Sequence, residues 1–206
     1  MKILISIGLL LSSFMGMAQT EHIQRLELGK KQKKLFNRGD SSMTIIIDTL
    51  IMADRSKLEF FGKKDVKLEI GYAEIGNNVV IFGQDSKNNA SNLDIKVNIQ
   101  KLGSLFLIGR GNDAMNGTKT YPNGNGAQIK LAYNTQGIQP QMTNKKGKNF
   151  LFVDVEPGGL RSSADNEIRQ IYSRISLSSP GLRGLPQGQI YSGSPGNQGK
   201  FELVAY

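Results

Sequence analysis

The sequence predicts a mainly β protein, built as a right-handed parallel β-helix or related β-solenoid or, as the alternative, as an antiparallel β-sandwich or barrel. Between Met43 and Tyr133, apolar runs of 5 to 9 residues recur between Gly, Asn and Asp. Several runs alternate apolar and polar residues, which gives each strand one apolar face. A Gly follows the apolar end of several runs, where a solenoid coil must turn a corner. No fixed period of 20 to 25 residues is evident, so both architectures stay open.

The first element is a predicted signal peptide, residues 1–18. Lys2 precedes an almost entirely apolar run, and Gly16 and Ala18 place small residues at the third and last positions before the cut. The run is too short to span a bilayer comfortably, and no later apolar run approaches about 18 residues. We therefore expect a secreted, periplasmic or cell-surface protein that begins at Gln19 and has no transmembrane segment.

Residues 19–42 are predicted to form a basic N-terminal arm, because their apolar residues fit a helix or a strand about equally badly. Four lysines cluster in it as candidate binding residues: Lys30, Lys31, Lys33 and Lys34. The alternative is a solvated linker. Removing residues 1–18 takes away one base and no acid, so the formal charge of +9 becomes +8.

A positive charge of this size favours anionic partners. Nucleic acid is not expected, because the chain is predicted to be exported and its basic runs carry no interleaved aromatic platforms. An anionic polysaccharide or an envelope protein is the expected partner. A role of the charge in solubility alone is the alternative.

Residues 43–177 are predicted to form a β-rich domain that ends in a helix. The predicted strands are Thr44–Met52, Lys57–Phe61, Val66–Ile70, Asn78–Phe82, Leu93–Ile99, Ser104–Ile108, Ala127–Tyr133 and Phe150–Val155. The helix is predicted over Asp165–Leu177, because Asp165 can cap it and Ile168, Ile171 and Ile175 fall on one face.

The segment Gly109–Gly117 is a candidate calcium site. Its Gly-x-Gly-x-Asp spacing matches most of a calcium-binding nonapeptide, with Asn112 and Asp113 as the oxygen ligands. No second copy follows to complete the shell. The alternative is therefore an Asn-Asp turn closed by its own side chains, with no cofactor.

Residues 178–206 are predicted to be a Gly/Pro-rich tail that closes with a strand over Phe201–Tyr206. Apolar residues spaced along the tail predict an extended path against the β domain or against a second chain, so the tail could support an oligomer. Arg183 and Tyr191 are its candidate binding residues.

Several enzyme classes are excluded by composition. With no Cys and one His, the chain cannot form a Cys-His zinc site, a thiol nucleophile or a disulfide framework. A polysaccharide lyase or glycoside hydrolase on a β-helix remains the alternative function, because such enzymes use clustered carboxylates. The sequence pattern of Lys57–Phe60 recurs ten residues later in Lys67–Ile70. If the two segments occupy equivalent positions in the fold, Glu59 and Glu69 could be neighbours. The main reading of these residues is a solvated strand face.

The chain resembles uncharacterised secreted proteins of Bacteroidetes in its predicted signal peptide and in its short apolar runs separated by Gly-rich turns. This resemblance spans most of the mature chain but carries no specific motif. The sequence thus predicts an exported, non-catalytic binding or structural protein of the cell envelope or surface, with no catalytic residues.

Overall fold

The computed structural model describes residues 19–39, 41–114, 121–160 and 195–206, and these form β-strands joined by turns and loops. The strands are β1 (Gln19–Leu28), β2 (Lys33–Phe36), β3 (Ser42–Met52), β4 (Lys57–Phe61), β5 (Asp65–Ile75), β6 (Val79–Gln84), β7 (Asn92–Leu102), β8 (Ser104–Ile108), β9 (Gln128–Tyr133), β10 (Phe150–Asp154) and β11 (Lys200–Ala205).

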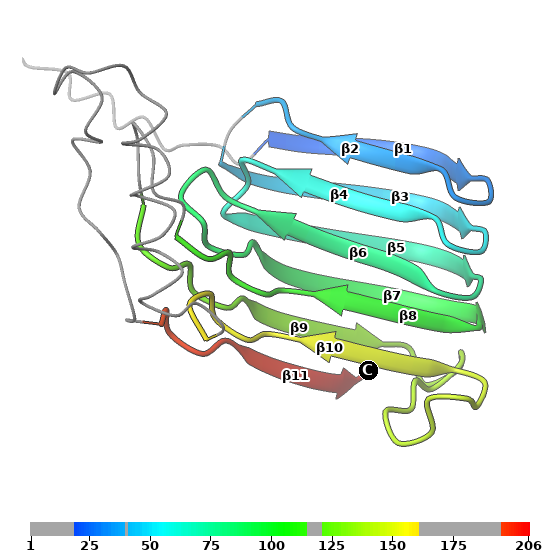
Figure 1. Ribbon diagram of the computed structural model, residues 1–206. Helices are drawn as coiled ribbons and strands as arrows, with labels where there is room; N and C mark the ends of the chain where they lie inside the picture. The colour runs from blue at the N-terminus through cyan, green and yellow to red at the C-terminus, as the bar shows by residue number, and fades with distance from the viewer. Residues whose placement is uncertain (1–18, 40, 115–120, 161–194) are drawn as a thin grey trace, which may run out of the picture.

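The strands form two parallel sheets. One has the order β1-β3-β5-β7-β9-β11, and the other has the order β10-β8-β6-β4-β2. The chain passes from one sheet to the other and back, and the two sheets lie face to face (Figure 1). The fold is therefore a β-solenoid, as predicted, and the antiparallel alternative is wrong.

The coils have a nearly constant length at first and lengthen towards the C-terminus. In the longer sheet, Gln19 pairs with Met43 and Met43 pairs with Val66, so the first two steps are almost equal. Hydrogen bonds between later coils join residues with growing sequence separations: 27 for Asp65 and Asn92, 36 for Asn92 and Gln128, and 72 for Asn125 and Asn197. Insertions in the later coils thus conceal a period that the first coils keep.

The hydrophobic core fills the space between the two sheets. Alternate side chains of each strand point inwards, so that Ile45, Leu68 and Ile95 stack in register on the longer strands, while Leu58 and Leu107 face them from the other sheet. All of these side chains are almost completely buried. Burial of stacked apolar rows is the main source of stability in such a fold.

Residues 19–42 are a correction to the sequence analysis, because they do not form an arm. They form β1 and β2 and reach the first residue of β3, so they are the first coil of the solenoid. The strands predicted from Thr44 to Val155 and from Phe201 to Tyr206 are present with boundaries shifted by a few residues. The predicted helix over Asp165–Leu177 lies outside the described residues, and so does most of the predicted tail.

Two charged side chains point into the first coil. Glu21 is in register with the buried Ile45, and Lys34 is in register with the buried Leu58. Lys34 stays half-buried with its Nζ 5.2 Å from the centre of the Phe36 ring. Inward-pointing charges on edge strands oppose pairing with another chain, so the N-terminal end of the solenoid is protected against edge-to-edge association.

One set of left-handed corners is occupied by residues other than glycine. Lys31, Arg55 and Asn78 have φ angles of 62°, 62° and 56° and occupy equivalent turns of successive coils. Among the glycines that close apolar runs, Gly62 has a positive φ of 71°. At Gly83, by contrast, an added Cβ would lie 2.6 Å from the Ser91 hydroxyl, so close packing at the connection from β6 to β7 requires glycine there.

A row of glycines joins the long loops of the later coils. The N–H of Gly124 donates to the Asn112 carbonyl at 2.8 Å, Gly158 donates to Gly124 at 2.8 Å, and Gly196 donates to Gly158 at 3.0 Å. A Cβ on Gly158 would overlap the Asn112 carbonyl oxygen. The Gly-rich loops are thus stacked by backbone hydrogen bonds, which leave no room for side chains.

Candidate functional site

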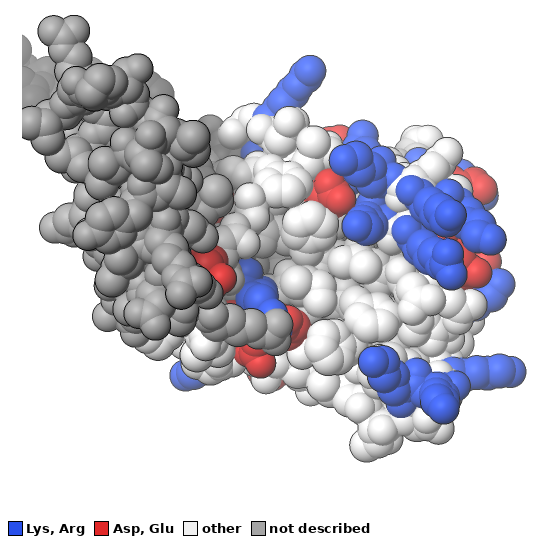
Figure 2. Space-filling model, in the orientation of Figure 1, with Lys and Arg blue, Asp and Glu red and all other residues white. Residues whose placement is uncertain are grey.

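The two outer faces of the solenoid differ in chemistry. The outer face of the six-stranded sheet carries mainly charged and amide side chains, whereas the outer face of the five-stranded sheet carries mainly apolar ones. Figure 2 shows the second face as a broad uncharged surface with lysine and arginine side chains gathered beside it. Each face is a candidate binding surface of a different kind.

A groove with a volume of about 600 Å³ crosses the outer face of the six-stranded sheet. Two rows of outward side chains border it, and both run from coil to coil at right angles to the strands. The first ladder is Ser42, Asp65, Asn92, Gln128 and Lys200, and the second ladder is Thr44, Lys67, Asp94, Lys130 and Glu202.

Charges of opposite sign alternate along the second ladder, where Lys67, Asp94, Lys130 and Glu202 follow one another in register. Within the described ranges, no three side chains of His, Asp or Glu gather closely enough to hold a metal ion. The carboxylates of the groove are interleaved with ammonium groups from coil to coil.

Beside the groove, Lys67 and Glu69 form an exposed ion pair with Nζ and Oε1 2.8 Å apart. The hydrogen bond from Lys67 lowers the pKa of the Glu69 carboxyl below its ordinary value, and the same bond raises the pKa of Lys67. A general acid at neutral pH needs a raised carboxyl pKa, so Glu69 is tuned in the opposite direction.

Glu59 and Glu69 are not neighbours. Glu59 lies on β4 of one sheet and Glu69 on β5 of the other, and both point outwards, so the solenoid separates them. The two similar segments therefore do not occupy equivalent positions, because one lies in a strand of one sheet and the other in a strand of the other sheet. Glu59 is only 6% exposed and has Lys33 Nζ at 3.9 Å.

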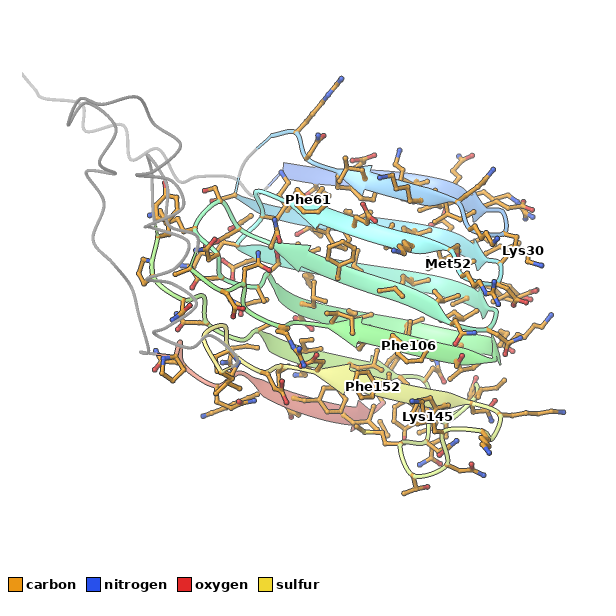
Figure 3. The ribbon with its side chains drawn as sticks, viewed as in Figure 1. Lys30, Met52, Phe61, Phe106, Lys145 and Phe152 are labelled. Carbon is orange, nitrogen blue, oxygen red and sulfur yellow. The ribbon has the colours of Figure 1, made fainter. Side chains whose placement is uncertain are left out.

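The outer face of the five-stranded sheet forms a surface that we call the aromatic face. It consists of Leu35, Phe61, Val80, Phe82, Phe106, Ile108 and Phe152. Phe106 and Phe152 have ring centres 5.6 Å apart, and so do Phe61 and Phe82. Phe152 is 40% exposed. Figure 3 shows Phe61, Phe106 and Phe152 on different strands of this sheet.

Basic side chains lie beside the aromatic face. One register row runs from Lys33 through Lys57 and Val80 to Phe106 and Phe152, so two lysines continue the apolar row towards the N-terminal coil. Three exposed lysines, Lys145, Lys146 and Lys148, lie in the loop before β10.

The acidic side chains near the aromatic face are buried or paired. Glu59 is buried, and Arg110 is 2.9 Å from Asp154 and 2.6 Å from Glu156. The rim is therefore basic.

The predicted lysine cluster is divided among three places. Lys30 and Lys31 lie exposed in the turn between β1 and β2, and Lys33 is exposed on the outer face of β2. Lys34 points inwards over Phe36, so it cannot act with the other three. The predicted tail residues Arg183 and Tyr191 lie outside the described residues.

The predicted calcium ligands have partners within the chain. The Asp113 carboxylate accepts a hydrogen bond from the N–H of Gly159 at 2.6 Å, and the Asn112 amide donates to Gln84 at 2.7 Å. These contacts join successive coils. The two residues thus link neighbouring loops, and calcium at this position stays a hypothesis.

Sequence reasoning missed the groove and the aromatic face. A signal for the aromatic face was present, because Val79–Phe82, Ser104–Ile108 and Phe150–Val153 are apolar at nearly every position. Continuous apolar runs are typical of strands covered on both faces. The groove gave no such signal, because its side chains come from strands that lie far apart in the sequence.

No helix that is long and apolar enough to cross a membrane occurs in the described part of the chain. In comparisons with known proteins, no family model, curated protein or solved structure matches this sequence.

Proposed function

We propose that this is an exported, non-catalytic binding protein of the cell envelope or surface, and that its aromatic face docks on an acidic surface of a partner protein. The observation that carries the proposal is the apolar outer face of β2, β4, β6, β8 and β10. Contiguous exposed apolar surface with a polar rim marks interaction sites, and aromatic residues are enriched at the centres of protein interfaces.

The chemistry of the face favours a protein over an anionic polysaccharide as its occupant. A polyanion would pair with Lys33 and Lys57 but would leave the apolar centre around Phe106 and Phe152 in water. A protein surface covers that centre and gains roughly 25 cal/mol for each Å² of apolar surface buried. The basic rim then selects an acidic partner and accelerates the encounter.

Replacing Phe106 and Phe152 together with Ser should weaken binding to the partner at least ten-fold, about 1.4 kcal/mol, because aromatic residues at the centre of an interface dominate its affinity. The measurement is a pull-down from the native envelope with the tagged protein, followed by titration of the partner that is recovered. Salt should weaken the same complex through the lysine rim.

The matched control is the Thr44→Ser, Lys96→Gln variant, which alters the opposite outer face. It should recover the same partner with wild-type affinity. Circular dichroism checks that both variants keep the wild-type fold. Equal recovery of the partner by the Phe106→Ser, Phe152→Ser variant would refute the proposed docking face.

Export itself is tested by the N-terminus of the mature protein. Mass spectrometry of secreted or periplasmic material should give a chain that begins at Gln19, free or cyclised to pyroglutamate, because the small residues Gly16 and Ala18 define the cut. Mature protein that retains Met1 would contradict the export proposal.

A further inference from the structure

We infer that the groove on the six-stranded sheet binds a linear, uncharged polysaccharide that lies along the solenoid axis, across β3, β5, β7, β9 and β11. This inference does not depend on the proposed function, because it concerns the opposite outer face. The groove is lined by both acidic and basic side chains, whereas the whole chain carries a net positive charge.

The shape of the groove requires an elongated ligand. The groove crosses five strands that lie about 4.8 Å apart, so it is about 19 Å long. An extended peptide repeats on one face every ~6.8 Å, which does not match this spacing. A glycan chain advances by about one strand separation per sugar ring, so each ring can meet an equivalent position of the next coil.

The chemistry of the ladders requires hydroxyl groups and no net charge. The ammonium groups of Lys67 and Lys130 can donate hydrogen bonds to a ligand in the groove, whereas the carboxylates of Asp94 and Glu202 can accept them. A polyanion would meet two carboxylates and two ammonium groups on this ladder, so it would gain little net electrostatic attraction. A hydroxyl group both donates and accepts, so a neutral glycan can bond to every position.

Two side chains of the first ladder, Asp65 and Asn92, are held in place before any ligand arrives. Asn92 Nδ2 donates to Asp65 Oδ1 at 2.8 Å, and the Asn92 Oδ1 accepts from the Gln128 N–H at 2.9 Å. Ordered side chains lose less conformational entropy on binding. On the second ladder, Asp94, Lys130 and Glu202 make no ion pair within 4 Å in the described part of the chain, so their polar atoms can serve a ligand.

The test is a calorimetric titration of the full-length protein with neutral hexasaccharides of the cellulose, xylan and mannan types, and with a hexauronate as the anionic probe. At least one neutral hexasaccharide should bind, and its affinity should change less than two-fold when salt is raised from low to high concentration. The Asp94→Leu, Lys130→Leu variant should lose at least ten-fold in affinity. The Glu74→Leu variant, on the same face outside the groove, should bind like the wild type.

Three results would overturn the inference. They are binding of the hexauronate alone with strong salt dependence, an unchanged affinity in the Asp94→Leu, Lys130→Leu variant, and no heat with any of the neutral hexasaccharides. The Phe106→Ser, Phe152→Ser variant separates the two proposals, because it should bind the neutral hexasaccharide normally while it loses the protein partner.

Discussion

Replacement of Phe60 with Ala is expected to lower the free energy of unfolding by about 3 to 5 kcal/mol. Phe60 is 0% exposed and stacks on Phe36 with ring centres 5.4 Å apart and planes 15° apart. Its removal leaves a cavity between the sheets, next to the inward face of the first coil. Urea unfolding followed by circular dichroism gives the change.

The matched control is Phe152→Ala, on the same sheet but on its outer face, where the side chain is 40% exposed. We expect this variant to lose about 1 kcal/mol or less, because the side chain already meets water. Equal losses in the two variants would mean that the core does not lie between the sheets as described.

Ending the chain after Gly199 is expected to cost about 3 to 6 kcal/mol. The deletion removes β11, whose Phe201 and Leu203 pack against the core, together with backbone hydrogen bonds such as the one from Lys200 to Ala127 at 3.0 Å. It also converts β9 into an unprotected edge strand. Thermal unfolding and light scattering report the two effects.

Glu202→Gln is the control for this truncation, because its exposed side chain lies on the outer face of the same strand. It should change stability by no more than about 0.5 kcal/mol. A truncated protein that melts at the wild-type temperature would show that β11 adds nothing to the solenoid.

The short strands could be predicted from sequence because their alternation is local. Leu58 and Phe60 alternate with Lys57 and Glu59, and that pattern fixes a strand wherever it lies. Two of the long strands, β5 and β7, were predicted to end too early, because their inward positions change step. In β5 the step is two from Leu68 to Ile70 and then three to Ala73.

The first coil escaped prediction for a related reason. Its inward positions include Glu21 and Lys34, and charged residues at core positions remove the apolar pattern that marks a strand. The period escaped because its clearest marker, the left-handed turn residue, is occupied by Lys31 and Arg55. L-residues other than Gly, Asn and Asp rarely adopt this conformation, so sequence alone did not mark the position.

The candidate sites depend on register, which sequence did not provide. Asp94 and Glu202 share a ladder only because Ile129 pairs with both Leu93 and Phe201, which are distant from each other in the chain. The aromatic face likewise required knowing that Val80 and Phe106 lie in one row and point outwards. Residue types could be read from the sequence, but their convergence needed the fold.

The lengthening of the coils has a consequence for the order of folding. Closing a loop costs free energy that grows with the logarithm of its length. The step from Ile129 to Phe201 is about three times as long as the step from Gln19 to Met43, so its closure costs about 1 kcal/mol more. Contacts between near neighbours in the chain also form faster. We therefore expect the solenoid to nucleate in its early coils and to grow towards β11, which joins last and is the first strand to leave when the protein unfolds.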